Sequence, residues 1–249
     1  MYSVGTAVVD GLRIRYLKAG SGPPVIFIHG LGGRAEAWLY QLSRLRGKYT
    51  GVALDLRGFG ESEKPPVTPT LGDFARDVIG VLDWIGVDKT ILVGSSMGGM
   101  VALKAYEAEP KRIRMMILSN TAPRVRIDLS LLERIASGDR EASRIIASRL
   151  TQARASFDRL VDADPRYLLR VARTINREDL TGLLHRVHVP TLLIAGELDV
   201  ITPPRVMEEM ASRMPNAVLR IIAGAGHLSH IEKPREYTRL LMQYLSTHS

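Results

Sequence analysis

Short apolar segments alternate with longer amphipathic ones along most of the chain. Two β-rich runs, at residues 2–9 and 12–18, flank the turn dipeptide Asp10-Gly11, which predicts a two-stranded hairpin. Six brief, mainly apolar runs follow at residues 25–28, 51–54, 90–93, 115–118, 191–195 and 218–222. Such runs predict strands that are buried on both faces, as in a parallel sheet covered by helices.

Helical periodicity separates these predicted strands. The amphipathic stretches lie at residues 35–45, 71–85, 97–109, 203–214 and 234–245. Strands and helices in alternation predict an α/β fold with right-handed crossovers. We therefore expect a mostly parallel sheet of eight strands with helices on both faces.

One segment interrupts this alternation. From residue 124 to about 184 the periodicity is helical throughout, with breaks at Gly138-Asp139 and Asp164-Pro165. This pattern predicts a helical lid over the carboxyl edge of the sheet, which we call the cap segment (residues 123–184). The core domain would then comprise residues 1–122 and 185–249. The alternative is a pair of ordinary crossover helices.

The composition is that of an ordinary globular protein. The 249 residues are 45% hydrophobic and 24% charged, and there is no cysteine. The absence of cysteine excludes thiol nucleophiles and cysteine-ligated metal sites. Few Asn and Gln beside many Arg hint at a heat-adapted source.

The net charge of +8 first suggests a nucleic-acid partner. However, acidic residues are interleaved with the many arginines between residues 121 and 180, which is typical of a solvated, ion-paired surface. These acids are Asp128, Glu133, Asp139, Glu141, Asp158, Asp162 and Asp164. We therefore expect no nucleic-acid partner.

The first eleven residues lack the basic and apolar regions of a secretory signal, and no stretch approaches the roughly 20 apolar residues of a membrane span. We expect a cytoplasmic protein without a membrane partner. Whether the chain forms a homodimer is left open by the sequence.

The sequence GSSMG at residues 94–98 matches the G-x-S-x-G motif. It follows the apolar run 90–93 and opens the helical run 97–109, which is the strand-turn-helix setting of a nucleophile elbow. In such a turn the backbone of Ser96 is strained, and Gly94 and Gly98 let strand and helix approach each other. The alternative is a glycine-rich turn without chemistry.

A serine nucleophile needs a base and an orienting acid. His227 follows the last predicted strand, and Asp199 follows the strand at residues 191–195, so both are expected at the carboxyl edge of the sheet. The chain order Ser96, Asp199, His227 is that of the α/β-hydrolase fold. Glu197 is the competing acid.

The other candidates have structural interpretations. His29 and His230 are expected to be structural, His185 and His188 lie in a linker, and His248 lies in the tail. Asp55 is expected to hold its own loop in partnership with Arg57.

Backbone N–H groups must stabilise the negative charge that develops on a substrate carbonyl oxygen. We expect these donors to be the amide of Met97, which follows the nucleophile, and the amide of Leu31, in the glycine-rich loop 29–33. The glycines of this loop also suggest a phosphate site, but the Gly-Lys-Ser/Thr ending and the G-x-G-x-x-G spacing are both absent.

Over nearly its whole length, the chain resembles the α/β-hydrolase superfamily. The segments that carry the resemblance are HGLG at 29–32, DLRGFGES at 55–62, GSSMGG at 94–99, GELD at 196–199 and GH at 226–227. Ser96 separates the chain from members resembling haloalkane dehalogenases and epoxide hydrolases, which place Asp there. Asn120 stands where some relatives carry their acid, which favours Asp199 as the acid here.

Residues 96–100 and 118–122 are similar to 3-oxoadipate enol-lactonases and the carboxylesterases close to them. The resemblance implies hydrolysis of a small-molecule carboxylic ester or enol-lactone through an acyl-enzyme, without a cofactor or metal. Two alternatives stay open: cleavage of a carbon–carbon bond in a vinylogous diketone, and a non-catalytic receptor on a hydrolase scaffold.

The predicted substrate pocket is lined by Trp38, Met100 and side chains of the cap segment. Arg124 and Arg126 are candidates to bind a substrate carboxylate. For each of these residues, a role in the core or on the solvated surface is the alternative.

Overall fold

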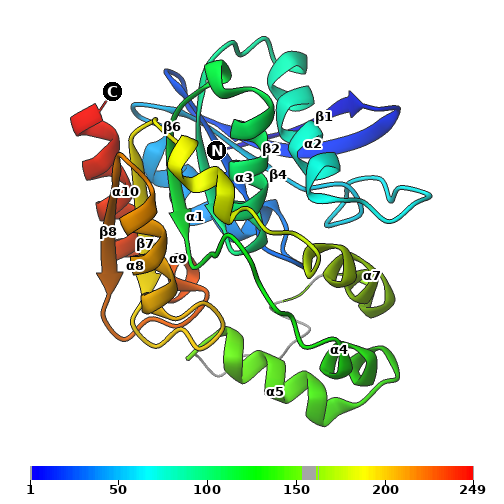
Figure 1. The fold of residues 1–249 in the computed structure, drawn as a ribbon. Coiled ribbons are helices and arrows are strands. Elements are labelled where there is room, and N and C mark those ends of the chain that lie inside the picture. The colour runs from blue at the N-terminus through cyan, green and yellow to red at the C-terminus, as the bar shows by residue number, and fades with distance from the viewer. Residues whose placement is uncertain (1, 153–160, 162, 249) are drawn as a thin grey trace.

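Eight strands form a single sheet in the computed structural model, which describes residues 2–152, 161 and 163–248 (Figure 1). The strands are β1 (Ser3–Val9), β2 (Leu12–Ala19), β3 (Pro24–Ile28), β4 (Thr50–Leu54), β5 (Thr90–Ser95), β6 (Ile113–Ser119), β7 (Thr191–Gly196) and β8 (Ala217–Ile222). Their order across the sheet is β1-β2-β4-β3-β5-β6-β7-β8. The prediction of a mostly parallel α/β sheet of eight strands is confirmed.

The antiparallel part of the sheet lies at one edge. β1 and β2 form the predicted hairpin around Asp10 and Gly11, both of which have positive φ angles, and β2 also runs antiparallel to β4. All pairings from β4 to β8 are parallel. The carboxyl ends of β3 and β5 to β8 therefore meet at one edge, where the loops of the predicted site begin.

Helices cover both faces of the sheet. Phe74 of α2 (Leu71–Trp84), Val101 of α3 (Met97–Ala108) and Met207 of α8 (Pro204–Arg213) belong to one core cluster. Leu42 of α1 (Leu39–Leu45) and Leu241 of α10 (Pro234–His248) belong to the cluster on the other face. The alternating side chains of β3 to β7 supply both clusters, which explains why these runs are apolar at nearly every position. β8 is the edge strand, and Val218 and Ile221 are 41% and 46% exposed, so the apolar run 218–222 is not buried on both faces.

The cap segment runs between β6 and β7 and contains α4 (Leu129–Ala136), α5 (Arg140–Leu150), α7 (Pro165–Ile175) and the 3₁₀ helix η3 (Thr181–Arg186). Figure 1 shows α4 and α5 at the end of the molecule, away from α2 and β1. The described part of the cap segment has no strand. Residues 153–160 and 162, and with them Asp158 and Asp162, lie outside the described residues, and the division into core and cap domains stays a prediction.

Aspartates begin α4, α5 and α7, the three α-helices in the described part of the cap segment. The side chains of Asp128, Asp139 and Asp164 each accept hydrogen bonds from amides in the first turn of α4, α5 and α7. These bonds satisfy N–H groups that have no partner within the helix. The acids that the sequence suggested as ion-pair partners therefore also define where the helices start.

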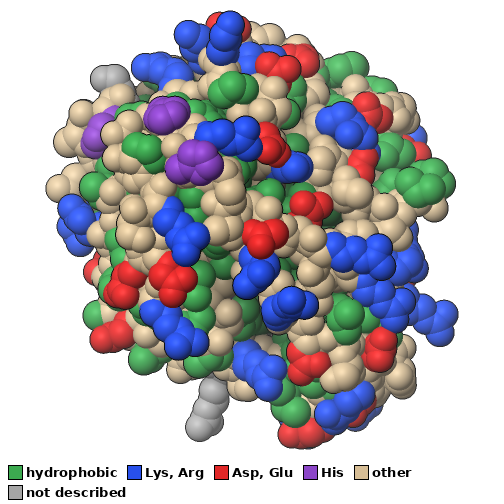
Figure 2. Space-filling view, in the orientation of Figure 1, with side chains coloured by type: hydrophobic (Ala, Val, Ile, Leu, Met, Phe, Trp, Pro, Cys, Tyr) green, Lys and Arg blue, Asp and Glu red, His purple; other side chains and the backbone are tan. Residues whose placement is uncertain are grey.

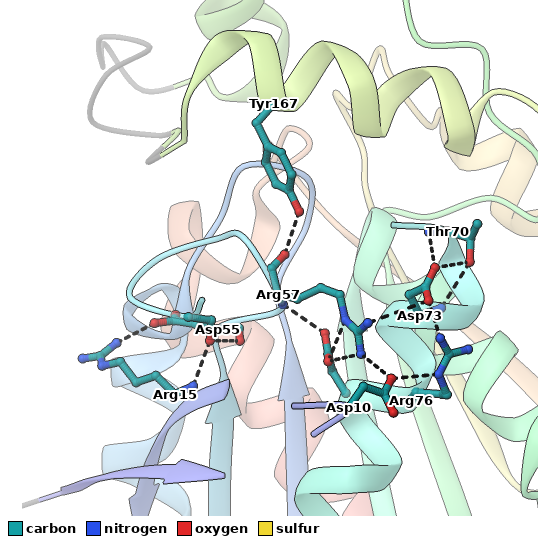
Figure 3. Close-up of polar contacts among 10 residues, drawn as sticks. Asp10, Arg15, Asp55, Arg57, Thr70, Asp73, Arg76 and Tyr167 are labelled. Atoms are coloured by element: carbon teal, nitrogen blue, oxygen red, sulfur yellow. Dashed lines mark hydrogen bonds and ion pairs between the residues drawn. The ribbon is translucent and has the colours of Figure 1, made fainter. Parts of the chain in front are cut away.

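Helix α7 forms hydrogen bonds with the segment that follows β4. The Tyr167 hydroxyl donates a hydrogen bond of 3.0 Å to the carbonyl oxygen of Arg57, as Figure 3 shows, and its ring packs against Phe59. Thr174 Oγ1 donates to the carbonyl oxygen of Pro69 at 3.0 Å. One side of the cap segment is thus bound directly to the loops that follow β4.

The predicted partnership of Asp55 with Arg57 is wrong. Asp55 pairs with Arg15 at 2.8 Å, whereas Arg57 pairs with Asp77 and Asp10. Figure 3 shows these two groups on opposite sides of the loop that carries both residues. Because the two side chains leave the loop in different directions, each finds a partner that is distant in the sequence. Asp55 still holds its own loop, since it accepts a hydrogen bond from Glu61 N at 3.0 Å.

Basic and acidic side chains are interspersed on the face that Figure 2 shows. Ion pairs such as Arg173–Glu133 and Arg134–Asp139 lie at the surface of the cap segment.

Across residues 2–152, 161 and 163–248, every helix falls short of the length and apolar character that a bilayer span requires.

Candidate active site

Ser96 is the single residue between the end of β5 and the start of α3. Its φ of 55° and ψ of −121° are strained for a residue with a side chain. Close packing surrounds this turn, because a Cβ atom on Gly98 would lie 2.2 Å from the carbonyl oxygen of Ile28. The structure therefore has the sharp strand-turn-helix geometry that the GSSMG motif predicts.

His227 lies between Ser96 and Asp199. Its Nε2 atom is 2.9 Å from Ser96 Oγ, and its Nδ1 atom is 2.8 Å from Asp199 Oδ2. His227 and Asp199 are only 2% and 3% exposed. The fold thus brings together three predicted residues that are far apart in the chain.

The Asp199 carboxylate accepts hydrogen bonds at both of its oxygen atoms. Oδ1 accepts from the amides of Ile201 and Thr202, at 2.8 and 3.0 Å. Oδ2 accepts from Thr202 Oγ1 at 2.7 Å and Asn120 Nδ2 at 2.9 Å, in addition to His227. Burial opposes ionisation, but the bonds from His227, Asn120 and Thr202 outweigh it and lower the pKa of Asp199 to about 2.

An ionised Asp199 fixes the tautomer of His227. The carboxylate can only accept, so His227 Nδ1 carries the proton and donates it to Asp199. The Nε2 atom is then left with a lone pair directed at the Ser96 hydroxyl. This arrangement allows His227 to act as a general base toward Ser96.

Asn120 supports the acid from the end of β6, where it has a positive φ of 47°. Its Nδ2 group donates to Asp199 and to the carbonyl oxygen of Gly226, and its Oδ1 atom accepts from Ser229 Oγ at 2.5 Å. Asn120 thereby connects the loop that carries Asp199 to the loop that carries His227. The structure places it beside Asp199 as a partner of the acid.

Thr202 was not predicted from the sequence, although it contacts the acid through both its amide and its hydroxyl. A local feature of the sequence could have identified Thr202. An Asp side chain commonly accepts from amides two and three residues further on, so the spacing Asp199-x-x-Thr202 before two prolines indicated such a turn.

The competing residues have other contacts. Glu197 accepts a hydrogen bond from Gly224 N at 2.8 Å. His29 Nε2 accepts from the amide of Leu56, and burial lowers the pKa of His29. His230 is buried and stacks on Trp38 with ring centroids 4.3 Å apart, and burial, followed by the proximity of His227, lowers its pKa to about 3. Both histidines pack as the sequence interpretation expected.

A cavity of about 660 Å³ lies beside Ser96 and His227. Met100 lines it, as predicted, and so do apolar side chains of the cap segment, including Leu131, Ile146, Leu168 and Ile175. Arg124, Arg126 and Arg149 also line the cavity and have exposed side chains. An apolar cavity with a few charged groups is typical of a site for a small molecule.

The prediction that Trp38 contacts the substrate is wrong. Trp38 is fully buried between Phe27, His230 and Tyr237, and it is not among the residues that line the cavity. The predicted helix 35–45 begins as a 3₁₀ helix, η1 (Ala35–Trp38), and Trp38 belongs to the core cluster shared with α1 and α10. Its side chain therefore contributes to the core.

The amides proposed to bind an oxyanion lie at the same cavity. Leu31 and Met97 both line it next to Ser96. Within the described part of the chain, neither N–H group donates to a protein acceptor. Both donors are therefore available to a bound molecule.

No cluster of His, Asp and Glu suited to a metal ion occurs among the described residues.

The sheet order, the strained serine turn, and the acid and base on the loops after β7 and β8 together define an α/β-hydrolase architecture. The model of the alpha/beta hydrolase family matches residues 25–240, and the chain belongs to that family.

Known proteins are similar to the chain over nearly its full length. The dihydrolipoyllysine-residue acetyltransferase component of the acetoin cleaving system from Cupriavidus necator is 30% identical, with 96% of this chain and 68% of that protein covered. The 3-oxoadipate enol-lactonase 1 of Acinetobacter baylyi is 25% identical, with 91% and 90% covered. A thermophilic esterase from Thermogutta terrifontis superposes with a TM-score of 0.90 at 26% identity, covering 99% of this chain and all of that one.

Proposed function

We propose that the protein is a serine hydrolase that cleaves a carboxylic ester or a lactone through an acyl-enzyme intermediate. The observation that carries this proposal is the hydrogen-bonded series from Ser96 Oγ through His227 to Asp199, which lies at a largely apolar cavity. Relatives described as an esterase and an enol-lactonase support the same reaction class.

The first half of the reaction acylates Ser96. Ser96 Oγ attacks the carbonyl carbon of the substrate while His227 Nε2 takes the hydroxyl proton. The resulting oxyanion accepts hydrogen bonds from the amides of Leu31 and Met97, each of which contributes on the order of 3 kcal/mol to lowering the barrier. When the ester bond breaks, His227 returns the proton to the leaving alcohol oxygen.

The second half releases the acid. A water molecule gives a proton to His227 and attacks the acyl carbon, and the proton then returns to Ser96 as the carboxylic acid leaves. Asp199 stays ionised throughout and stabilises the imidazolium that forms in each half. Every step uses groups of this chain, the substrate and one water molecule.

The arginines at the cavity favour a second candidate, an enol-lactone that carries a carboxylate. Arg124 faces Asp179 at 3.5 Å, whereas Arg126 forms no ion pair with any described residue. A guanidinium of this kind can bind a carboxylate through two parallel hydrogen bonds. The proposal predicts that Arg126→Gln raises KM for a carboxylate-bearing lactone and leaves KM for a neutral lactone unchanged. Arg144→Gln, at an exposed position of α5, is the matched control.

Short-chain p-nitrophenyl esters, lactones and a vinylogous diketone test the reaction class directly. We expect turnover of esters or lactones by the wild type and none above background by Ser96→Ala. Diketone cleavage with negligible ester turnover would instead favour carbon–carbon bond hydrolysis. A folded chain that cleaves none of these substrates would contradict the proposal and favour a receptor on a hydrolase scaffold.

A further inference from the structure

The carboxylate of Glu232 binds three backbone amides from two distant parts of the chain. Glu232 is the last residue of the short helix α9 (Ser229–Glu232). Its Oε2 atom accepts from Gly226 N at 3.1 Å and from Gln152 N at 3.0 Å, and its Oε1 atom accepts from Leu228 N at 3.2 Å. No lysine or arginine among residues 2–152, 161 and 163–248 forms an ion pair with it. The amides therefore satisfy this carboxylate.

Two of these amides flank the base. Gly226 and Leu228 are the neighbours of His227 on either side, so the carboxylate fixes the backbone from which the imidazole projects. Gly226 permits this approach, because a Cβ atom there would lie 3.1 Å from Oε1. The separation between His227 Nε2 and Ser96 Oγ depends on where this short loop is held.

The third amide belongs to the cap segment. Gln152 lies two residues beyond the end of α5, and Leu228 N also donates to the carbonyl oxygen of Leu150 at 3.1 Å. Ile146, Arg149 and Leu150, at the same end of α5, line the cavity. Glu232 thus binds the loop of the base and one wall of the cavity through a single carboxylate.

We propose that Glu232 is a positioning residue that acts through His227 and couples this base to the end of α5. This inference rests on the proposed function. Because the position of the imidazole affects the chemical step more than the binding of a small ester, loss of the carboxylate is expected to lower kcat. A misplacement of about 1 Å costs up to 100-fold in rate.

Glu232→Gln is the most direct variant, since glutamine has nearly the same shape but only one acceptor oxygen, and its NH₂ group would face an amide donor. Glu197→Gln is the matched control, because Glu197 accepts from a single amide of the same loop, that of Gly224, two residues before Gly226. Steady-state hydrolysis of p-nitrophenyl acetate gives kcat and KM. The value of kcat is expressed per active site, and the number of active sites is determined by titration with a fluorophosphonate. The low-field proton NMR signal of His227 Nδ1–H, assigned by its loss in His227→Ala, reports on the base without any substrate.

We expect Glu232→Gln to lower kcat per titrated site by about 10- to 100-fold, with KM for p-nitrophenyl acetate within about twofold of wild type. We also expect its Nδ1–H signal to shift or broaden, while Glu197→Gln matches the wild type in both readouts. Wild-type kcat and an unchanged signal in Glu232→Gln would overturn the proposal.

Gly226→Ala provides a second variant if Glu232→Gln does not fold, because the added Cβ displaces the carboxylate without removing it. We expect it to change kcat and the Nδ1–H signal in the same direction. No change in either would overturn the proposal. A wild type that is inactive and unlabelled would refute the proposed hydrolase, whereas the NMR comparison tests the role of Glu232 independently of activity.

Discussion

Two regions of the molecule contain a buried aspartate, Asp77 in α2 and Asp199 after β7, but only Asp199 lacks a permanent cation as its partner. In the first region, the Arg57 cluster (Figure 3), Arg57 pairs with the fully buried Asp77 at 2.7 Å and with Asp10 at 3.1 Å. In the second, Asp199 meets only neutral donors and His227, and no described lysine or arginine forms an ion pair with it.

The difference indicates which carboxylate is suited to the proposed reaction. The charge of Asp77 is compensated by Arg57 at all times, although burial is strong enough to raise the pKa of Asp77. The charge of Asp199 has no such partner and is therefore available to an imidazolium that forms during the reaction. A buried aspartate held by neutral donors is suited to catalysis, and one held by an arginine is suited to stabilising the fold.

Asp199→Asn is expected to have the largest effect, and this effect is on activity. In Asp199→Asn, an amide donor in place of the carboxylate oxygen would make His227 Nδ1 an acceptor, so that Nε2 carries the proton and cannot receive that of Ser96. We expect kcat to fall on the order of 10⁴-fold. Steady-state ester hydrolysis measures this loss, and circular dichroism checks the fold. A fall of less than tenfold would contradict the role of Asp199.

Asp77→Asn is the converse test. Removing one charge from the buried pair leaves Arg57 partly uncompensated, and we expect the free energy of unfolding to fall by about 3 kcal/mol. Urea denaturation measures this change. Activity per titrated site is expected to equal that of wild type, so a folded Asp77→Asn protein with impaired kcat would break the distinction between the two regions.

Acid pH is expected to lower the stability of the fold before it protonates Asp199. The folded pKa of His230 is about 3, below its unfolded value near 6.5, so the unfolded chain binds a proton that the folded chain excludes. The contribution of His230 to the free energy of unfolding is therefore fully present above about pH 6.5, and it falls on the order of 1 kcal/mol per pH unit toward pH 3.

His230→Phe keeps an aromatic ring next to Trp38 and removes this titration. We expect the variant to lose less stability than the wild type between pH 6.5 and pH 4, as followed by urea denaturation at each pH. Equal slopes for the two proteins would refute the contribution of His230. Asp199, with a pKa of about 2, stays ionised over this whole range.

The smallest expected effect concerns the attachment of the cap segment near the Arg57 cluster. Tyr167→Phe removes the hydrogen bond to the carbonyl oxygen of Arg57 but keeps the ring against Phe59. We expect a loss of about 1 kcal/mol in the free energy of unfolding and no change in kcat. Thermal denaturation with ester kinetics measures both. An unchanged stability would contradict a contribution of this hydrogen bond to the attachment of α7.

Features with a local origin were predictable from the sequence. Strands of the sheet leave short apolar runs in the sequence, and Ser96, Asp199 and His227 each follow such a run in a short motif, so their meeting at one edge follows from the parallel sheet. Features that depend on the direction of a side chain were not predictable. Trp38 turns into the core, and Asp55 and Arg57 find partners that lie elsewhere in the chain. The three amides at Glu232 come together only in the folded chain.

The most direct test of the account is the reaction of the folded protein with a fluorophosphonate, followed by peptide mass spectrometry. A fluorophosphonate is attacked by a serine whose hydroxyl is activated by a neighbouring base. We predict one adduct per chain, located on Ser96, and a much slower reaction in His227→Ala. A folded wild-type chain that forms no adduct, or forms it on another residue, would contradict the assignment of Ser96 as the nucleophile.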